Sequence, residues 1–282
     1  MERTSIRLGG VELQSSIMNA SGPRSAERGE IYELAAVHRG AIVFKSCNLA
    51  GLDAPDNLKN AGVEHFAAIA GALAPRGKVI IASIVGASEE EVIAVARRLE
   101  RSGAAILELN LADPYVLNSI APFASLDRLK ALIERVRGAV GCVLAVKLAP
   151  AAGYSARALA GVLKSTRVAI AVCQNDPPKD LEIDLATGIA RGPERALSHA
   201  HAIFREGEGL LDVVAVGGIN TGRDAYLAHL MGATAVQVGS ALIKEGAGAL
   251  GRIDRELDAL LAEHGKRSVG EIVGQLSFEP RG

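Results

Sequence analysis

The segment VVAVGGINTGRDAYLAHLMGATAVQVGS (213–240) decides the fold. It opens with a short apolar run, 213–218, and closes with a second one, 235–240. A helical pattern, 223–231, lies between these two runs, so the segment reads as strand, helix, strand. Strands connected in this way are typically parallel neighbours, because the crossover helix returns the chain to the same end of the sheet.

The same alternation extends over the rest of the chain. Six further candidate strands are apolar on both faces, as in strands buried in a parallel sheet, and they cover 15–20, 41–46, 79–85, 105–110, 143–149 and 168–175. The other candidate helices cover 26–38, 88–103, 125–136, 155–164, 193–204 and 247–264. This pattern predicts a single (β/α)8 TIM barrel domain over 1–282, with an open doubly wound sheet as the alternative. A Gly9-Gly10 turn predicts a short N-terminal β-hairpin before the barrel.

Composition and charge exclude several classes of protein. The formal net charge of −1 gives no basic field for nucleic acid or an anionic membrane. Three widely spaced cysteines, Cys47, Cys142 and Cys173, argue against a disulfide framework or a zinc site, and the histidines show no metal-ligand spacing. The start MERTSIRLGG has no apolar signal core, and no apolar run is long enough to span a bilayer. We therefore expect a cytoplasmic protein without a metal.

Polar residues fall at the ends of several candidate strands. Lys45, Asn110, Lys147 and Asn175 lie at or near the carboxyl ends of four of them. A buried lysine or asparagine without a partner costs free energy, so such residues need a reason to be there. Active sites of TIM barrels are built at this end of the strands, and we therefore expect a working site there.

A phosphate site is predicted at the last two strands. Gly217-Gly218 ends the seventh strand, and Gly239-Ser240 ends the eighth. Glycine lets the backbone approach a ligand closely, so that its N–H groups can hold phosphate oxygens. The loops after strands seven and eight are the usual phosphate site of these barrels. Either pair alone would be explained by a tight turn between strand and helix.

A series of motifs carries a family resemblance over nearly the whole chain. They are MNASG (18–22), FKS (44–46), ASIVGAS (82–88), LELNLADP (107–114), VKLAP (146–150), QNDPP (174–178) and the long stretch 214–246. With these motifs the chain resembles the cytosolic, class 1 dihydroorotate dehydrogenases, a family of FMN-dependent barrels. The resemblance implies oxidation of dihydroorotate to orotate in pyrimidine biosynthesis, by a homodimer. It leaves the electron acceptor open between fumarate and an NAD-linked partner subunit.

The resemblance also assigns roles to individual residues. It implies FMN binding by Ala20, Ser21, Lys45, Ser46, Asn110, Lys147, Gly217, Gly218, Gly239 and Ser240. It implies substrate binding by Asn60, Asn110, Asn175 and Asp176. A lysine at the polar edge of the flavin would stabilise the negative charge that hydride transfer brings there, as Lys147 is expected to do.

The substrate side departs from the family pattern. Where the family has a cysteine or serine base, this chain has Asp113, and Tyr115 replaces a substrate-binding asparagine. An ordinary aspartate, with a pKa of about 4, is a weak base for a C–H bond, but burial can raise that pKa. We expect Asp113 to be the catalytic base or a substrate anchor, and the resemblance places Lys45, the other candidate catalytic residue, at the flavin ring. The simpler alternative is that Asp113 only caps the turn at Pro114 or pairs with an arginine.

Two further readings remain open. Asp176 stands where the family has serine, so two new carboxylates would repel the carboxylate of dihydroorotate unless a cation such as Lys59 compensates. The enzyme would then act on another cyclic or amide compound that is neutral or cationic. The other reading is a flavin- or phosphate-binding barrel without catalytic turnover.

Overall fold

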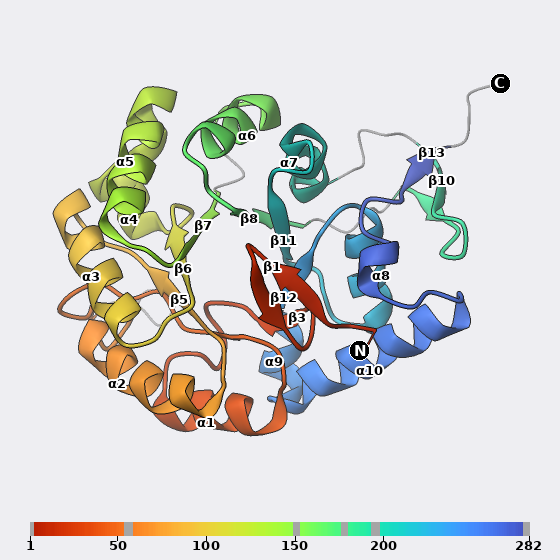
Figure 1. Cartoon of the computed structure of the whole chain (residues 1–282), viewed down its shortest axis with the longest axis horizontal. Helices are drawn as coiled ribbons and strands as arrows, with labels where there is room; N and C mark the ends of the chain where they lie inside the picture. Colours follow the sequence, from red (N-terminus) through yellow and green to blue (C-terminus); the bar gives the residue numbers. More distant parts are fainter. Residues whose placement is uncertain (1–2, 54–58, 149–152, 176–179, 193–197, 279–282) are drawn as a thin grey trace.

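Eight parallel strands form the centre of the molecule in the computed structural model, which describes residues 3–53, 59–148, 153–175, 180–192 and 198–278. The strands are β3 (Ile17–Asn19), β4 (Ile42–Val43), β5 (Ile80–Ile84), β6 (Ile106–Asn110), β7 (Val143–Lys147), β8 (Ile170–Gln174), β11 (Asp212–Val216) and β12 (Ala235–Val238). Their order in the sheet is β3-β12-β11-β8-β7-β6-β5-β4, with helices around the outside (Figure 1). The predicted TIM barrel is therefore confirmed, and every predicted strand is present.

The helices surround the strands. They are α1 (Arg28–Val37), α2 (Val63–Leu73), α3 (Glu89–Arg101), α4 (Pro114–Ser119), α5 (Leu126–Ala139), α6 (Ala156–Ser165), α7 (His199–Gly207), α8 (Gly222–Leu230), α9 (Ser240–Glu245) and α10 (Gly248–Glu263). Serine side chains cap α3, α5, α6 and α7 by accepting a backbone N–H of the first turn. The helix predicted over 193–204 is described only from its cap onward, because 193–197 lie outside the described residues. Helices α2, α4 and α9 were not predicted.

A side chain joins the two ends of the sheet. The strand order begins at β3 and ends at β4, and no ladder between them is present in the described chain. There the buried Asn19 donates from Nδ2 to the Val43 carbonyl (2.6 Å) and accepts the Val43 N–H at Oδ1 (2.9 Å). One amide thus makes the two hydrogen bonds that a neighbouring strand would make, and it closes the barrel.

The predicted N-terminal hairpin closes the amino end of the barrel. It consists of β1 (Ile6–Leu8) and β2 (Val11–Leu13), and it lies across the centre of the ring in Figure 1. Leu8 and Leu13 pack into the barrel interior, and Gly9 donates its N–H to Asp212 Oδ2 (2.7 Å) at the start of β11. A Cβ on Gly9 would come within 2.9 Å of the side chains of Val143 and Ile170, so the hairpin fits tightly.

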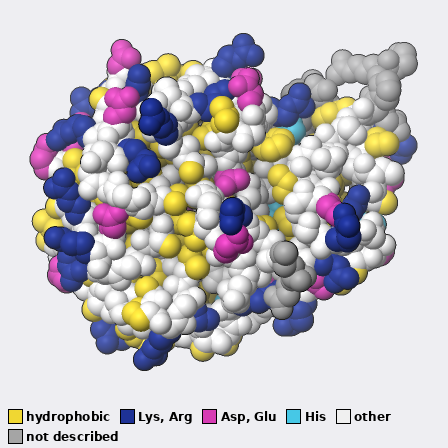
Figure 2. All heavy atoms as spheres, viewed as in Figure 1, with side chains coloured by type: hydrophobic (Ala, Val, Ile, Leu, Met, Phe, Trp, Pro, Cys, Tyr) yellow, Lys and Arg dark blue, Asp and Glu magenta, His cyan; other side chains and the backbone are white. Residues whose placement is uncertain are grey.

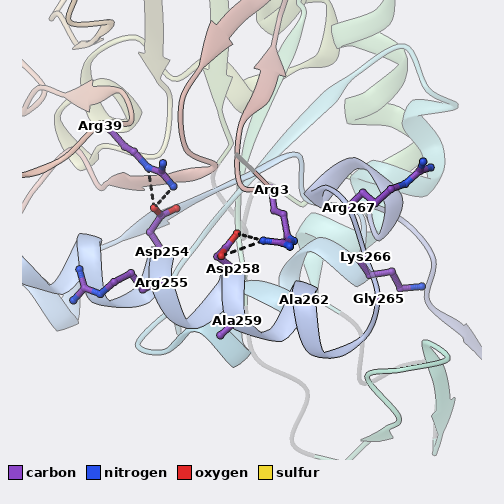
Figure 3. Close-up of a pocket in the computed structure, with 10 residues that line it drawn as sticks. All are labelled: Arg3, Arg39, Asp254, Arg255, Asp258, Ala259, Ala262, Gly265, Lys266 and Arg267. Atoms are coloured by element: carbon purple, nitrogen blue, oxygen red, sulfur yellow. Dashed lines mark hydrogen bonds and ion pairs between the residues drawn. The ribbon is translucent and has the colours of Figure 1, made fainter. Parts of the chain in front are cut away.

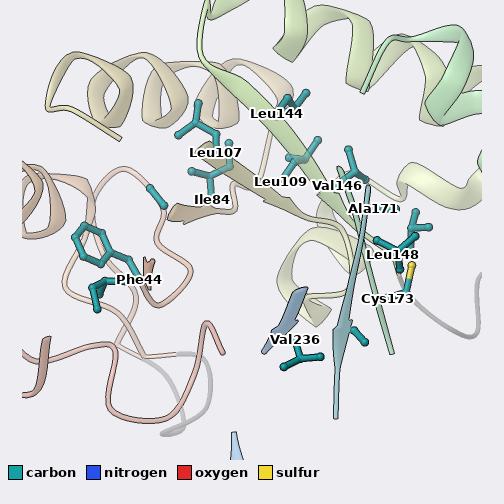
Figure 4. Packing of buried hydrophobic residues seen from close by; sticks show 14 of the residues in the cluster. Phe44, Ile84, Leu107, Leu109, Leu144, Val146, Leu148, Ala171, Cys173 and Val236 are labelled. Atoms are coloured by element: carbon teal, nitrogen blue, oxygen red, sulfur yellow. The ribbon is translucent and has the colours of Figure 1, made fainter. Parts of the chain in front are cut away.

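Strand alternation gives the barrel two cores. Leu107, Leu109 and Val146 point outward to the helices (Figure 4), whereas Ile106, Ala145 and their neighbours fill the interior near the hairpin. Towards the carboxyl ends of the strands, the same alternation points polar side chains into the interior. The interior is therefore apolar at the amino end and polar towards the carboxyl end, where the site lies.

A small sheet was not predicted. It joins β9 (Glu182–Ile183), β10 (Ile189–Arg191) and β13 (Ser277–Phe278), which packs beside the barrel through Ala190, Met231 and Leu276. Within the described ranges, none of the helices combines the length and the apolar character that crossing a bilayer requires.

Candidate active site

A cavity of about 300 Å³ opens at the carboxyl ends of the strands. Its lining includes eight of the residues predicted from the sequence, namely Ala20, Ser21, Lys45, Ser46, Asn60, Asn110, Asp113 and Lys147. These residues follow β3, β4, β6 and β7 or end them, and the loop containing Asn60 closes one side. The polar residues that the sequence places at separate strand ends are therefore brought together around one space.

Asp113 has two roles in this cavity. Its Oδ1 accepts the backbone N–H of Tyr115 (2.9 Å), so it caps the short helix α4, and the same side chain lines the cavity. Burial raises the pKa of Asp113 above its ordinary value, although the Tyr115 N–H and the positive charges of Lys45 and Lys147 oppose that rise. The capping role is thus real, and it leaves the carboxylate facing a space in which it can act as a base.

Two lysines, Lys45 and Lys147, also line this cavity. Burial lowers the pKa of Lys45, while the negative charge of Asp113 raises it. The Lys147 ammonium donates to Ser21 Oγ (3.0 Å) and lies 3.6 Å from a carboxylate oxygen of Glu108. Among the described residues that line the cavity, these two lysines are the basic side chains and Asp113 is the acidic one.

A buried polar network lies below the cavity, and sequence reasoning missed it. Glu108 on β6 is fully buried, and its oxygens accept Ser83 Oγ–H (3.0 Å) and Gln237 Nε2–H (2.7 Å). Ser83 Oγ lies 2.9 Å from Ser46 Oγ, which accepts Asn110 Nδ2–H at 2.9 Å. Glu108 precedes Asn110 by two residues on one strand, so the alternation of side chains was the signal for it.

The loop after β4 holds Asn60 in place. Its buried Oδ1 accepts the backbone N–H of Gly62 (3.1 Å) and of Asn48 (3.4 Å), which fixes the amide beside the cavity. Lys59 instead lies 3.7 Å from Asp53, and both side chains are largely exposed. Lys59 is not among the described residues that line the cavity, so it does not supply the compensating charge.

The predicted phosphate-binding residues lie beside this cavity rather than in its lining. Val216 and Gln237 are register partners in β11 and β12, so Gly217-Gly218 and Gly239-Ser240 follow neighbouring strands at the same end of the barrel. Gly217 and Gly218 have positive φ angles of 110° and 71°, which favour glycine. Buried Asn175 donates to the Gly217 carbonyl (3.2 Å), and its Oδ1 has no partner among the described residues. Asp176 lies outside the described residues.

The cysteines do not take the place of the family base. Cys47 and Cys173 are buried, and burial raises the pKa of both thiols. Neither residue is among those that line the cavity. A buried thiol of this kind behaves as a small apolar side chain.

A larger cleft of about 760 Å³ lies at the other end of the barrel, beside α10. Its carboxylates are already engaged, because Arg39 pairs with Asp254 (2.7 Å) and Arg3 with Asp258 (3.3 Å) (Figure 3). Arg255 extends away from these pairs, so the charges of this cleft do not converge on a ligand (Figure 3). On the hairpin face of the molecule, basic and acidic side chains are interspersed (Figure 2).

Comparison with known proteins identifies the relatives of this chain. The family model described as dihydroorotate dehydrogenase matches residues 56–261. The dihydroorotate dehydrogenase (fumarate) of Trypanosoma cruzi is 29% identical over 92% of this chain and 93% of its own length. The putative dihydroorotate dehydrogenase A (fumarate) of Streptococcus equi subsp. equi is 25% identical over 99% of this chain and 100% of its own length. The ligand-free DHODH structure from Eimeria tenella has the same fold, with a TM-score of 0.80, 18% identity and coverage of 98% of this chain and 92% of that chain.

Proposed function

The chain belongs to the dihydroorotate dehydrogenase family, and from that premise we propose that it is an FMN-dependent oxidoreductase in which Asp113 is the catalytic base. The substrate is a small ring compound with a CH–CH bond next to a carbonyl, and dihydroorotate is the first compound to test. The gathering of Lys45, Asn110, Asp113 and Lys147 around one cavity carries this proposal. These are the groups needed to hold a polar ring and to take a proton from its substrate.

The residues present fit FMN. Asn110 and Lys147 have donor groups at the cavity, which suits the carbonyl-bearing edge of an isoalloxazine ring. Gly217 and Gly218 have no side chains and adopt positive φ angles, so their backbone N–H groups are accessible, as a phosphate cradle requires. The unpartnered Oδ1 of Asn175 offers an acceptor nearby. We propose that Ala20, Ser21, Lys45, Ser46, Asn110 and Lys147 bind the ring, and that Gly217, Gly218, Gly239 and Ser240 bind the phosphate.

The reaction divides between the cofactor and the protein. FMN, when bound, supplies the acceptor for a hydride from one substrate carbon. The Asp113 carboxylate takes the proton from the neighbouring carbon, next to the carbonyl, and the electron pair of that C–H bond forms the new C=C bond. Asn60, Asn110 and Asn175 orient the substrate through their amides. Lys45 lies close enough to Asp113 to affect its pKa, and it stabilises the ionised form of the base.

A substrate other than dihydroorotate is the second candidate. The sequence suggested that Asp113 and Asp176 would repel a carboxylate. In the described lining, however, Asp113 lies near two ammonium groups, and because Lys147 also pairs with Glu108 (3.6 Å), Lys45 supplies the compensating charge. The case for a neutral or cationic substrate therefore depends on Asp176.

An anaerobic visible spectrum of the purified protein tests the proposal. We expect a flavin band that bleaches when dihydroorotate is added. A flavin band that persists with dihydroorotate but bleaches with a neutral amide analogue would favour the second candidate. A protein that binds FMN and is reduced by neither compound would support a binding protein without turnover. A folded protein that cannot bind FMN would overturn the proposal.

We also propose a homodimer, on the basis of family membership. Sedimentation velocity of the purified chain should give the mass of two copies. A single species with the mass of one copy would contradict this part of the proposal.

A further inference from the structure

In the network below the cavity, every hydrogen bond from Asn110 to Glu108 is donated in the same direction, and Glu108 sets that direction. An ionised carboxylate only accepts hydrogen bonds, whereas a serine hydroxyl donates one and accepts others. The Ser83 hydroxyl gives its hydrogen to Glu108 Oε1 (3.0 Å), so towards Ser46 it must accept. Ser46 therefore donates its hydrogen to Ser83 and accepts a hydrogen bond from Asn110 Nδ2 (2.9 Å). The chain therefore runs one way, from Asn110 to Glu108.

The orientation of Asn110 is fixed from its other side as well. The backbone N–H of Ala112 donates to Asn110 Oδ1 (3.2 Å), which assigns that atom as the oxygen. The amide nitrogen consequently points towards Ser46, and its second hydrogen remains available at the cavity that Asn110 lines. Both contacts agree that Asn110 presents a donor, rather than its carbonyl, to a ligand.

Lys147 is tied to the same carboxylate. Its ammonium lies 3.6 Å from Glu108 Oε1 and donates to Ser21 Oγ (3.0 Å), while Gln237 Nε2 donates to the other oxygen of Glu108 (2.7 Å). Glu108 is fully buried and does not line the cavity, so it acts on a ligand only through these neighbours. A buried charge of this kind needs the pairing that Lys147, Ser83 and Gln237 provide.

We propose that Glu108 is a positioning residue whose carboxylate fixes the direction of the Ser83–Ser46–Asn110 chain and holds Lys147, so that the cavity floor presents donors. The ligand that such a floor selects carries acceptor atoms along one edge, as a ring with carbonyl oxygens does. This inference rests on the proposed function only for the identity of that ligand as FMN. The direction of the chain follows from the protein's own groups.

Three variants separate the roles. Ser83→Ala breaks the chain and keeps the charge of Glu108. Glu108→Gln keeps the shape and removes the charge. Its amide oxygen can still accept from Ser83, and its nitrogen can donate to Gln237 once the Gln237 amide turns over to present its oxygen, which has no partner among the described residues. Ser15→Ala is the matched control, because it also deletes a buried hydroxyl bonded to an acidic side chain, Asp254 (2.7 Å), but at the amino end of the barrel.

The first readout needs no cofactor. In the ligand-free protein, the side-chain amide signal of Asn110 in a ¹H–¹⁵N spectrum is assigned by its loss in Asn110→Asp. We expect Ser83→Ala to shift this signal and Ser15→Ala to leave it in place. An Asn110 signal that Ser83→Ala does not move, or that both variants move equally, would overturn the proposal.

The second readout is FMN itself, added to the apoprotein and followed by the quenching of its fluorescence. We expect Ser83→Ala to raise the Kd for FMN about tenfold, the effect of one lost hydrogen bond, and Ser15→Ala to change it less than twofold. Glu108→Gln should instead raise the midpoint potential of bound FMN, because the charge of Lys147 is no longer neutralised. An unchanged Kd and an unchanged potential in these two variants would refute the positioning role. If the wild-type chain bound no FMN, the proposed function would fail, while the amide signal would still test the chain from Ser83 through Ser46 to Asn110.

Discussion

Asp113 and Lys45 face one cavity, and burial drives both towards their neutral forms. Burial raises the pKa of Asp113 and lowers the pKa of Lys45, and each charge partly reverses the effect on the other. The range of pH in which both groups are charged is therefore narrower than for the same groups in water. An aspartate in this setting is a better base than an ordinary one, because its conjugate acid is weaker.

The pH profile of the reaction should show both groups. With Asp113 as the base and Lys45 as its cationic neighbour, kcat/KM should rise with pH through the raised pKa of Asp113. It should then fall through the lowered pKa of Lys45. Initial rates measured from pH 4 to pH 10 test this. A rate that stays flat down to pH 4 would rule out Asp113 as the base.

The Asp113→Asn variant separates the base from the helix cap. Asparagine caps helices as well as aspartate does, so α4 should keep its start while the base is lost. We expect the rate of flavin bleaching by substrate to fall by about 10²- to 10⁴-fold, with the Kd for FMN little changed. Stopped-flow absorbance at the flavin band measures the bleaching rate.

Two companion variants control this experiment. Asp53→Asn removes an exposed carboxylate near Lys59 and should leave the bleaching rate unchanged. Asp113→Ser keeps a capping side chain and introduces a residue type that the resembled family uses as base. A bleaching rate in Asp113→Asn equal to that of Asp53→Asn would leave Asp113 with the capping role alone.

Asn19→Ala should weaken the closure of the barrel between β3 and β4. It leaves the buried N–H and carbonyl of Val43 without the amide that pairs them, at a cost of about 2–4 kcal/mol in the free energy of unfolding. The exposed Asn118→Ala on α4 should change this free energy by less than about 0.5 kcal/mol. Urea unfolding followed by circular dichroism compares the two. Equal stability of both variants would show that the Asn19 amide does not stabilise the closure between β3 and β4.

His229 should make the fold sensitive to acid. It is fully buried, its Nδ1–H donates to the Ala233 carbonyl (2.7 Å), and its Nε2 lies 3.0 Å from Ser16 Oγ. Burial favours the neutral ring, in which Nε2 accepts from Ser16. Burial lowers its pKa from 6.5 to about 4. As the pH falls from 6.5 to 4, the unfolded chain binds a proton that the folded chain does not bind. Stability should therefore fall with decreasing pH, by about 3 kcal/mol in all.

The test of this prediction is urea unfolding of wild type and His229→Gln at pH 7.5 and pH 5. The variant should be less stable at pH 7.5 because it loses the ring's contacts, yet it should lose less stability than wild type on going to pH 5. An identical loss in both proteins would assign the acid sensitivity to other groups.

Two glycines in helices should respond to alanine in opposite ways. A Cβ on Gly222, at the start of α8, would lie 2.4 Å from Glu256 Cβ and 2.5 Å from the Leu257 nitrogen, both in α10. Gly222→Ala should therefore cost about 1–3 kcal/mol of stability. Gly161, inside α6, has nothing within 4 Å of that position, and Gly161→Ala should stabilise by about 0.5–1 kcal/mol. Thermal unfolding of both variants measures the difference, and a shift in the same direction would contradict the packing of α8 on α10.

The barrel could be predicted from the sequence because its strands have a clear local pattern. Each strand is a short apolar run with polar or glycine residues at its end, as in 235–240. Helix α2 escaped prediction because its sequence, VEHFAAIAGAL, is rich in alanine and lacks a clear polar face. The small sheet escaped because its strands are two or three residues long and β13 pairs with β10 from a distant part of the chain.

For the site, the sequence found the residues that end strands and missed those within them. Lys45, Asn110 and Lys147 stand out where the apolar runs stop. Glu108 and Gln237 are hidden inside runs that read as apolar overall, and only the barrel's closure brings them together across its interior, 2.7 Å apart. The alternation along β6 could have shown that Glu108 points inward like Asn110, but its contact with Gln237, 129 positions away, depends on the fold as a whole.

The hairpin at the amino end also bears on kinetics. Because it fills that end of the barrel, small molecules reach the interior from the end where Asp113 lies. In the part of the chain that the structure describes, the cavity lies at that end, so a reducing substrate and an oxidising one that both enter there must take turns, one leaving before the other arrives. Double-reciprocal plots at several acceptor concentrations should then be parallel lines, the pattern of an enzyme that alternates between two stable forms.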